Sequence, residues 1–218
     1  MTWSPSRSRL GSLLPALLAI VMALGFAGAV RPAATPVKVS TITVSIPISV
    51  WTNVNSLSPN TSYWTSQRDA VRVGKNPSNN GVYRAFVQAD IVSLHSRAIL
   101  DARVQMVVDH SASCSPTPVQ LWQLNTIFSQ SLPVTYSNTA GVWVQQVSTV
   151  TAAANITCGQ PPVTVQFSGG GLTNALAIAV VNELPQFAVG LRAQDENNMF
   201  QWKKFRPTDM YLIVTYSD

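Results

Sequence analysis

The chain has 218 residues, of which 46% belong to the hydrophobic set and only 11% are charged, whereas soluble domains average about 25% charged residues. Disordered tails need low hydrophobicity or high net charge, and coiled coils are rich in charged helix formers, so this composition excludes both classes. The formal net charge is +5, but the only basic cluster is Lys203-Lys204 with nearby Arg206, which excludes the charge pattern of a nucleic-acid-binding protein.

Residues 1–29 are predicted to be a secretory signal peptide. A short segment with two arginines precedes an apolar run over residues 10–26, and Ala27-Gly28-Ala29 supplies the small residues of a cleavage site. The alternative is a retained membrane anchor, because residues 10–30 are numerous enough to span a bilayer. Glycines and a proline weaken such a helix, so we predict cleavage and no stable membrane span afterwards. Both interpretations place the rest of the chain outside the cytoplasm and predict a secreted, extracellular protein.

Cys114 and Cys158 are the only cysteines in the chain. An even number of cysteines in an exported protein predicts one disulfide bond, and the alternative is a pair of free, buried thiols. A metal site is disfavoured, because these cysteines lack the paired C-x-x-C spacing and His95 and His110 are the only histidines. We therefore expect no metal centre.

Residues 30–50 contain prolines and threonines and are predicted to form an N-terminal extension, followed by one domain over residues 51–218. In this domain short apolar runs alternate with polar residues at a period of two, which is typical of β-strands. Their regular spacing predicts an all-β protein, an antiparallel, jelly-roll-like β-sandwich. The predicted strands cover residues 82–91, 102–108, 119–124, 142–147, 163–167, 187–192 and 211–216.

One segment, residues 172–184, is a candidate for a helix. It follows Gly169-Gly-Gly171, and its apolar residues run almost without interruption. Such a pattern fits either a buried strand or a short crossing helix. We therefore predict at most one short helix.

Several motifs together resemble a known family. They are Tyr83-Arg-Ala-Phe, Leu100-Asp-Ala-Arg-Val, the stretch from His110 to Trp122 with Ser-Ala-Ser-Cys and Pro-Val-Gln-Leu-Trp, the stretch from Val189 to Phe205 with Gly-Leu-Arg-Ala and Trp-Lys-Lys-Phe, and the strand Tyr211-Leu-Ile-Val-Thr-Tyr. They resemble the DNRLRE domain family, as found in actinobacterial exported proteins, over residues 51–218.

The resemblance implies a β-sandwich related to carbohydrate-binding modules of family 96, some of which bind polysaccharides such as alginate. It also implies that Cys114 and Cys158 pair. The sequence departs from the family pattern at Ser131-Leu-Pro-Val-Thr-Tyr136, where relatives usually carry Thr-Trp before a proline. No ligand-binding residues accompany the motif.

A polar cluster surrounds the predicted turn near residue 195. In a binding role Arg192, Asp195, Glu196 and Trp202 would contact a sugar, because charged groups hydrogen-bond hydroxyls and an indole stacks on the apolar face of a sugar ring. The favoured interpretation is structural, with Trp202 packed beneath the loop and Arg192 or Arg84 paired with Glu196. The oxygens of residues 195–198 could hold Ca²⁺, but the spaced pattern of a calcium loop is missing, so no cofactor is expected.

Trp51, Tyr63 and Trp64 lie in a region rich in Ser, Asn and Thr. Because aromatic residues in such surroundings are less easily assigned to a core, these three are the best candidates for a platform on which a sugar stacks. An exposed row would favour glycan binding, and burial would favour a structural role.

Motifs for catalysis are lacking, so the protein is predicted not to be an enzyme. The first hypothesis is a secreted, non-catalytic binding module for a polysaccharide or cell-wall glycan. The alternative is a structural or adhesive cell-surface domain with no glycan ligand. The weakest is a polysaccharide lyase or hydrolase, which would need Asp90, Asp109 and Glu196 to converge in space.

Overall fold

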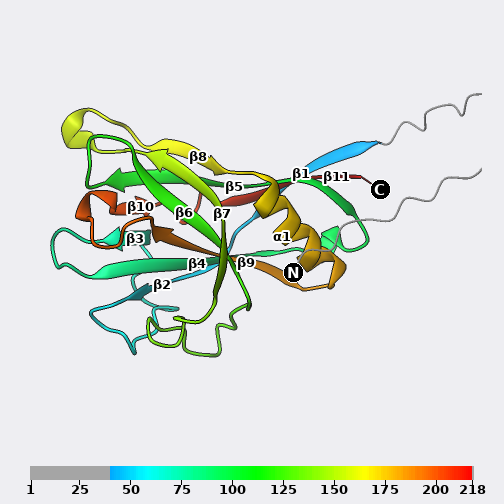
Figure 1. The fold of residues 1–218 in the computed structure, drawn as a ribbon, viewed down its shortest axis with the longest axis horizontal. Helices are drawn as coiled ribbons and strands as arrows, with labels where there is room; N and C mark the ends of the chain where they lie inside the picture. The colour runs from blue at the N-terminus through cyan, green and yellow to red at the C-terminus, as the bar shows by residue number, and fades with distance from the viewer. Residues whose placement is uncertain (1–39, 218) are drawn as a thin grey trace, which may run out of the picture. The chain divides into compact units, whose positions relative to one another are not determined.

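The computed structural model describes residues 40–217, so the predicted signal peptide lies outside the described residues. These residues form eleven strands and one α-helix, and every strand pair is antiparallel (Figure 1). The prediction of an all-β antiparallel sandwich with at most one short helix is therefore confirmed. The strands are β1 (Thr41–Pro47), β2 (Val50–Asn55), β3 (Val71–Lys75), β4 (Val82–Asp90), β5 (Ala98–Ser111), β6 (Thr117–Leu124), β7 (Trp143–Ala152), β8 (Val163–Phe167), β9 (Gln186–Ala193), β10 (Lys203–Phe205) and β11 (Tyr211–Ser217), and the helix is α1 (Gly170–Val181).

The strands form two layers that are joined along one side. In the first layer β5 is central, with β8 on one edge and β10 and β11 on the other, and β1 pairs with β11. The second layer has the order β2-β4-β9-β6-β7. Strand β3 pairs with β10 through Val71–Val73 and with β4 through Gly74 and Lys75, so it carries the sheet from one layer to the other.

The main core lies between the layers and follows the period of two in the sequence. Alternate residues of β4 and β5 point inward, as predicted, and they meet apolar side chains from β6, β8, β9 and β11. Helix α1 covers the open side of this core with five buried residues that recur once per helical turn. Of the two structures that fit residues 172–184, the chain therefore adopts the helix, which ends at Val181. The five are Leu172, Ala175, Leu176, Ala179 and Val180.

The predicted extension, residues 30–50, contributes a strand to the sandwich. Strand β1 pairs with β11 from Thr41 opposite Ser217 to Pro47 opposite Tyr211. The Thr43 and Thr215 hydroxyls are 2.8 Å apart across this pair. No helix within residues 40–217 has the length and apolar composition needed to cross a membrane.

Cys114 and Cys158 form a disulfide bond, with their Cα atoms 5.9 Å apart. The bond joins the turn after β5 to the 3-10 helix after β7 (Ile156–Cys158). The bond links two residues that are 44 positions apart in the sequence. Because this link persists when the protein unfolds, it reduces the conformational freedom of the unfolded chain.

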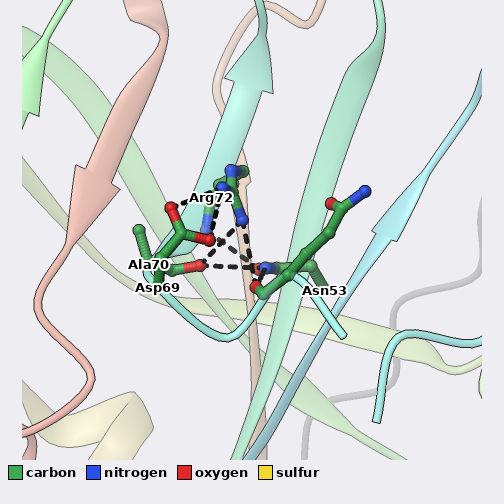
Figure 2. Close-up of polar contacts among 5 residues, drawn as sticks. Asn53, Asp69, Ala70 and Arg72 are labelled. Carbon is green, nitrogen blue, oxygen red and sulfur yellow. Dashed lines mark hydrogen bonds and ion pairs between the residues drawn. The ribbon is translucent and has the colours of Figure 1, made fainter. Parts of the chain in front are cut away.

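A buried asparagine fixes the long loop between β2 and β3. Asn53 is fully buried, and its amide nitrogen donates to the carbonyl oxygen of Ala70 at 2.9 Å and to that of Gln67 at 3.4 Å. Its amide oxygen accepts from the main-chain N–H of Arg72 at 2.9 Å. Figure 2 shows these contacts beside the ion pair of Arg72 with Asp69, whose shortest distance is 2.7 Å. One side chain thus satisfies two carbonyl groups of the loop and one N–H group at the start of β3.

We expect Asn53→Ala to lower the free energy of unfolding by about 2–4 kcal/mol, because it leaves buried main-chain donors and acceptors without partners. Urea unfolding of the purified protein measures the change. Asn79, in the surface turn between β3 and β4, is the matched control, and Asn79→Ala should cost much less. Equal costs at the two positions would contradict this role for Asn53.

Lys203 is fully buried in β10, and its amine contacts the hydroxyl of Thr117 at 2.5 Å. Burial lowers the pKa of Lys203 to about 8. The folded protein therefore binds this proton less tightly than the unfolded chain does. Between pH 8 and the usual lysine pKa the unfolded chain holds more protons, so the free energy of unfolding rises with pH in this range.

From pH 7 to pH 9.5 we expect the free energy of unfolding to rise by about 2 kcal/mol, from the difference between the two pKa values. Urea unfolding at the two pH values measures the rise. Lys203→Met keeps the length of the side chain and removes the titrating group, so its stability should stay nearly constant over the same range. A variant that kept the full rise would show that another group causes it.

Candidate functional site

The candidate site lies on the outer face of the second layer. Because side chains alternate along a strand, residues next to the core-facing ones in β4, β6 and β9 point outward. The loop over residues 125–142 covers part of this face and forms a second, smaller core with it. The buried residues of this second core are Val54, Phe86, Leu124, Val134 and Ala188.

Gln88 holds the covering loop on the sheet. Its buried amide donates to the carbonyl oxygen of Phe128 at 2.9 Å and accepts from the main-chain N–H of the same residue. This loop also contacts the β2–β3 loop, since the indole N–H of Trp64 donates to Leu132 O at 2.9 Å and the main-chain N–H of Ser137 donates to Pro59 O at 2.9 Å. The two loops are therefore fixed against each other and against the second layer.

Next to the loop, arginine and aromatic side chains alternate in what we call the arginine–aromatic row: Trp122, Arg192, Trp143, Arg84 and Tyr136. The guanidinium carbon of Arg192 lies 3.6 Å from the ring centroid of Trp122 and 5.4 Å from that of Trp143. That of Arg84 lies 5.6 Å from Trp143 and 4.6 Å from Tyr136. These contacts between a guanidinium and an aromatic face stabilise the cation. All five side chains of the row are partly exposed.

Arg84 is neutralised by Glu196. Two nitrogens of Arg84 donate to the two carboxylate oxygens of Glu196 at 2.7 and 2.6 Å, a bidentate ion pair with little exposure of either side chain. Burial lowers the pKa of Arg84, but its hydrogen bonds with Glu196 and the charge of that carboxylate outweigh burial and hold the pKa above its usual value. This pair fixes the turn after β9 against β4.

Arg192, in contrast, has no hydrogen-bond acceptor among residues 40–217. Burial against the indoles lowers its pKa, the charge of Glu196 opposes this shift, and the group remains a cation. Beside it is a polar hollow of about 400 Å³ lined by the chain from Arg192 to Asn197. The site therefore presents guanidinium N–H donors next to an aromatic surface.

The predicted stacking platform is not exposed. Only 4% of Trp51 and 6% of Tyr63 is accessible. Trp51 packs in the main core with Arg68 over its ring, and Trp64 is partly buried against the second core. This burial favours the structural role. The polar neighbours of Trp51 in β2 are themselves buried, and Asn53 is hydrogen-bonded to the adjoining loop.

The predicted hairpin cluster is divided by the structure. Arg192 and Glu196 face the arginine–aromatic row, whereas Trp202 is buried and meets Tyr83 edge-on at 5.1 Å between centroids. Asp195 accepts from the main-chain N–H of Asn197, and Glu196 binds Arg84, so their oxygens stabilise a turn and an ion pair. Among residues 40–217 no group of three or more His, Cys, Asp or Glu is placed to hold a metal ion.

The carboxylates considered for catalysis also have structural partners. Asp90 accepts from the main-chain N–H of Val92 at the end of β4, and Asp109 pairs with Arg206 at 2.7 Å. Asp90 lies opposite Gln186 at the start of β9, and Glu196 follows the end of that strand. Asp90 and Glu196 are therefore at opposite ends of one strand.

Trp122 and Trp143 are not among the site residues predicted from the sequence. The pattern in β6 contains the information: Val119 and Leu121 are buried, and Trp122 is in phase with Gln120, not with them. Trp143 has no such indication, because its position depends on the loop before it and on Gly190. Any side chain at Gly190 would overlap the Trp143 ring.

No protein-family model matches the chain, and no curated protein matches it either. Among solved structures, the K3 cleaved adhesin domain of Lys-gingipain from Porphyromonas gingivalis is similar with a TM-score of 0.37 and 10% identity, covering 78% of this chain and 94% of that one. The K1 cleaved adhesin domain of the same protein has a TM-score of 0.30 and 12% identity, covering 82% and 95%.

A Clostridium thermocellum xylanase 10B structure with CBM22-1 and GH10 modules, complexed with xylohexaose, has a TM-score of 0.30 and 12% identity. The match covers 81% of this chain and 28% of that one. At TM-scores this low, the ligands of these proteins say nothing about this chain.

We expect Gly190→Ala to lower the free energy of unfolding by about 1–3 kcal/mol, because the new methyl group forces Trp143 off the sheet. The same substitution in a Trp143→Leu background should cost less than half as much, because the overlap is then absent. Urea unfolding of the four proteins gives the coupling between the two positions. Additive costs would show that the methyl group acts elsewhere.

Proposed function

We propose that this protein is a secreted, non-catalytic binding module for a polysaccharide or cell-wall glycan, and that the arginine–aromatic row is its site. The main support for this proposal is the position of the Arg192 guanidinium. It lies over Trp122, is partly exposed, and has no hydrogen-bond acceptor among the described residues. Guanidinium N–H groups donate to sugar hydroxyls and carboxylates, and indoles pack against the apolar faces of sugar rings.

The surroundings of Arg192 support an uncharged, hydroxyl-rich ligand. Strands β6 and β7 beside the row carry glutamines, including Gln120, whose amide oxygen accepts from the Trp122 indole at 3.0 Å. Gln146, which lies opposite Trp122 in β7, is exposed. Amides donate and accept, as sugar hydroxyls do. The membership in the DNRLRE family suggested by the motifs is part of this proposal.

The carboxylates support a non-catalytic role, because Asp109 and Glu196 each bind an arginine and Asp90 caps a turn. A second candidate function is a structural or adhesive surface domain without a glycan ligand. The burial of Trp51 and Tyr63 and the Cys114–Cys158 disulfide favour it, since these features stabilise the sandwich and offer no surface.

Affinity gel electrophoresis against acidic and neutral polysaccharides distinguishes the two. We expect at least one polysaccharide to retard the protein, and Arg192→Gln to weaken this binding at least tenfold, since a charge-assisted donor set is lost. Arg206→Gln is the matched control, because this arginine is on the other layer, paired with Asp109, and its loss should leave retardation unchanged.

Thermal unfolding of both variants verifies that each remains folded. If no polysaccharide retards the protein, the glycan-binding function is wrong and the structural alternative is favoured. If both arginine variants lose retardation equally, binding depends on net charge and not on the arginine–aromatic row.

A further inference from the structure

A second cavity lies apart from Arg192, between α1, the end of β6 and the start of β9. Its volume is about 350 Å³, within the range of small-molecule sites in proteins. None of the residues that line it carries a charge. Its apolar wall is formed by Leu124, Ile127, Ala175, Ile178, Ala179, Leu184, Phe187 and Ala188.

The mouth of this cavity is apolar as well. Ile178 is 56% accessible, and Ile127 and Leu184 are also exposed at the rim. The opposite side of α1 already covers the main core through Leu172 and Leu176, so Ile178 contributes little to folding from its position. Clustered aliphatic side chains at the entrance of a hollow mark a surface that is stabilised when an apolar group covers it.

The polar groups of the cavity are at one side and are all uncharged. Asn125, Thr126, Gln123 and Gln186 line it there. The amide oxygen of Gln186 accepts from Gln88 at 3.1 Å, and the main-chain N–H of Asn125 donates to Val142 O at 3.1 Å, so this side is fixed to the sheet and to the covering loop. An aliphatic chamber with amides at its edge matches a ligand with an alkyl chain and a neutral, hydrogen-bonding end.

We propose that this cavity binds the alkyl chain of a small, uncharged amphiphile, with its hydroxyl or amide end at Gln123 and Gln186. A carboxylate end would have no cation to pair with in the lining, and the burial of its charge without a partner is costly. Seven of the eight apolar side chains are aliphatic, and Phe187 supplies the only ring. The lining therefore favours a flexible chain over a flat aromatic ligand.

The probes are the straight-chain alcohols hexanol, octanol, decanol and dodecanol, titrated into the full chain by calorimetry. Each added methylene should raise the affinity about fourfold, the fold-change that corresponds to ~0.8 kcal/mol per buried methylene, until the cavity is filled. Longer chains should then bind no tighter. Octanoate should bind at least tenfold more weakly than octanol, because the lining offers its charge no partner.

Two exposed residues of α1 provide a matched pair of variants. Ile178 lines the cavity, whereas Val181, 81% accessible on the same helix, does not. Ile178→Ser should weaken octanol binding about tenfold, and Val181→Ser should leave it within twofold. Because both side chains are exposed, neither substitution disturbs the main core.

Three results would overturn the proposal: binding that is independent of chain length, equal losses in Ile178→Ser and Val181→Ser, and a wild-type dimer that Ile178→Ser dissociates in size-exclusion chromatography. The last result would assign the surface to a second copy of the chain. The outcome is independent of glycan binding, since Arg192→Gln should leave octanol binding unchanged.

Discussion

Two buried side-chain amides, Asn53 and Gln88, fix the two loops of the second layer that contact each other. Asn53 binds two carbonyl groups of the β2–β3 loop and the N–H of Arg72 in β3, and Gln88 binds both main-chain groups of Phe128 in the β6–β7 loop. Each amide offers a donor and an acceptor, as a peptide group does, and so extends the hydrogen bonding of the sheet sideways to a loop. A buried amide without hydrogen-bond partners would lower the stability of the fold. Each loop is therefore held in the position in which the amide makes its hydrogen bonds.

Because the loops are held this way, β4 is buried on both faces. One face contributes Ala85 and Val87 to the main core, and the other places Phe86 under the covering loop. The outward position next to Phe86 belongs to Arg84, which reaches Glu196 at the edge of the second core. The ion pair is therefore partly shielded from water, where a charged hydrogen bond is stronger than on an open surface. The site depends on the loops as much as on the strands.

The strands could be predicted wherever one face is apolar and the other polar, as in β5, where Ala102, Val104 and Met106 alternate with polar residues. Strand β2 was not recognised because Thr52, Asn53 and Asn55 are polar and still buried. Their burial depends on loop carbonyls and N–H groups that are distant in the sequence. For the same reason, the polar residues next to Trp51 in β2 do not indicate that Trp51 is exposed.

The candidate site was predictable only in part. Arg192 and Glu196 were identified from their motif, and the pairing of Arg84 with Glu196 was one of the two alternatives considered. The tryptophans of the row were not, because Trp143 reaches Arg192 only where Gly190 leaves room beneath its ring. Such a close approach between two strands that are not neighbours in the sequence has no local pattern. The helix was ambiguous for a simpler reason: Ile178 and Val181 are apolar on its exposed side and hide the helical period.

The two arginines of the row differ in what they leave available for a ligand. Arg84 donates from two guanidinium nitrogens to Glu196 and so stabilises the turn. Its removal would leave the carboxylate of Glu196, which has low exposure, without a partner. Arg192 is held by Trp122 through the face of its guanidinium, a contact that leaves the N–H groups at the edge of that plane unused. In a chain with only 11% charged residues, few other ions compete for those groups. Stacking on an indole thus orients Arg192 and keeps its donors available, which an ion pair would not.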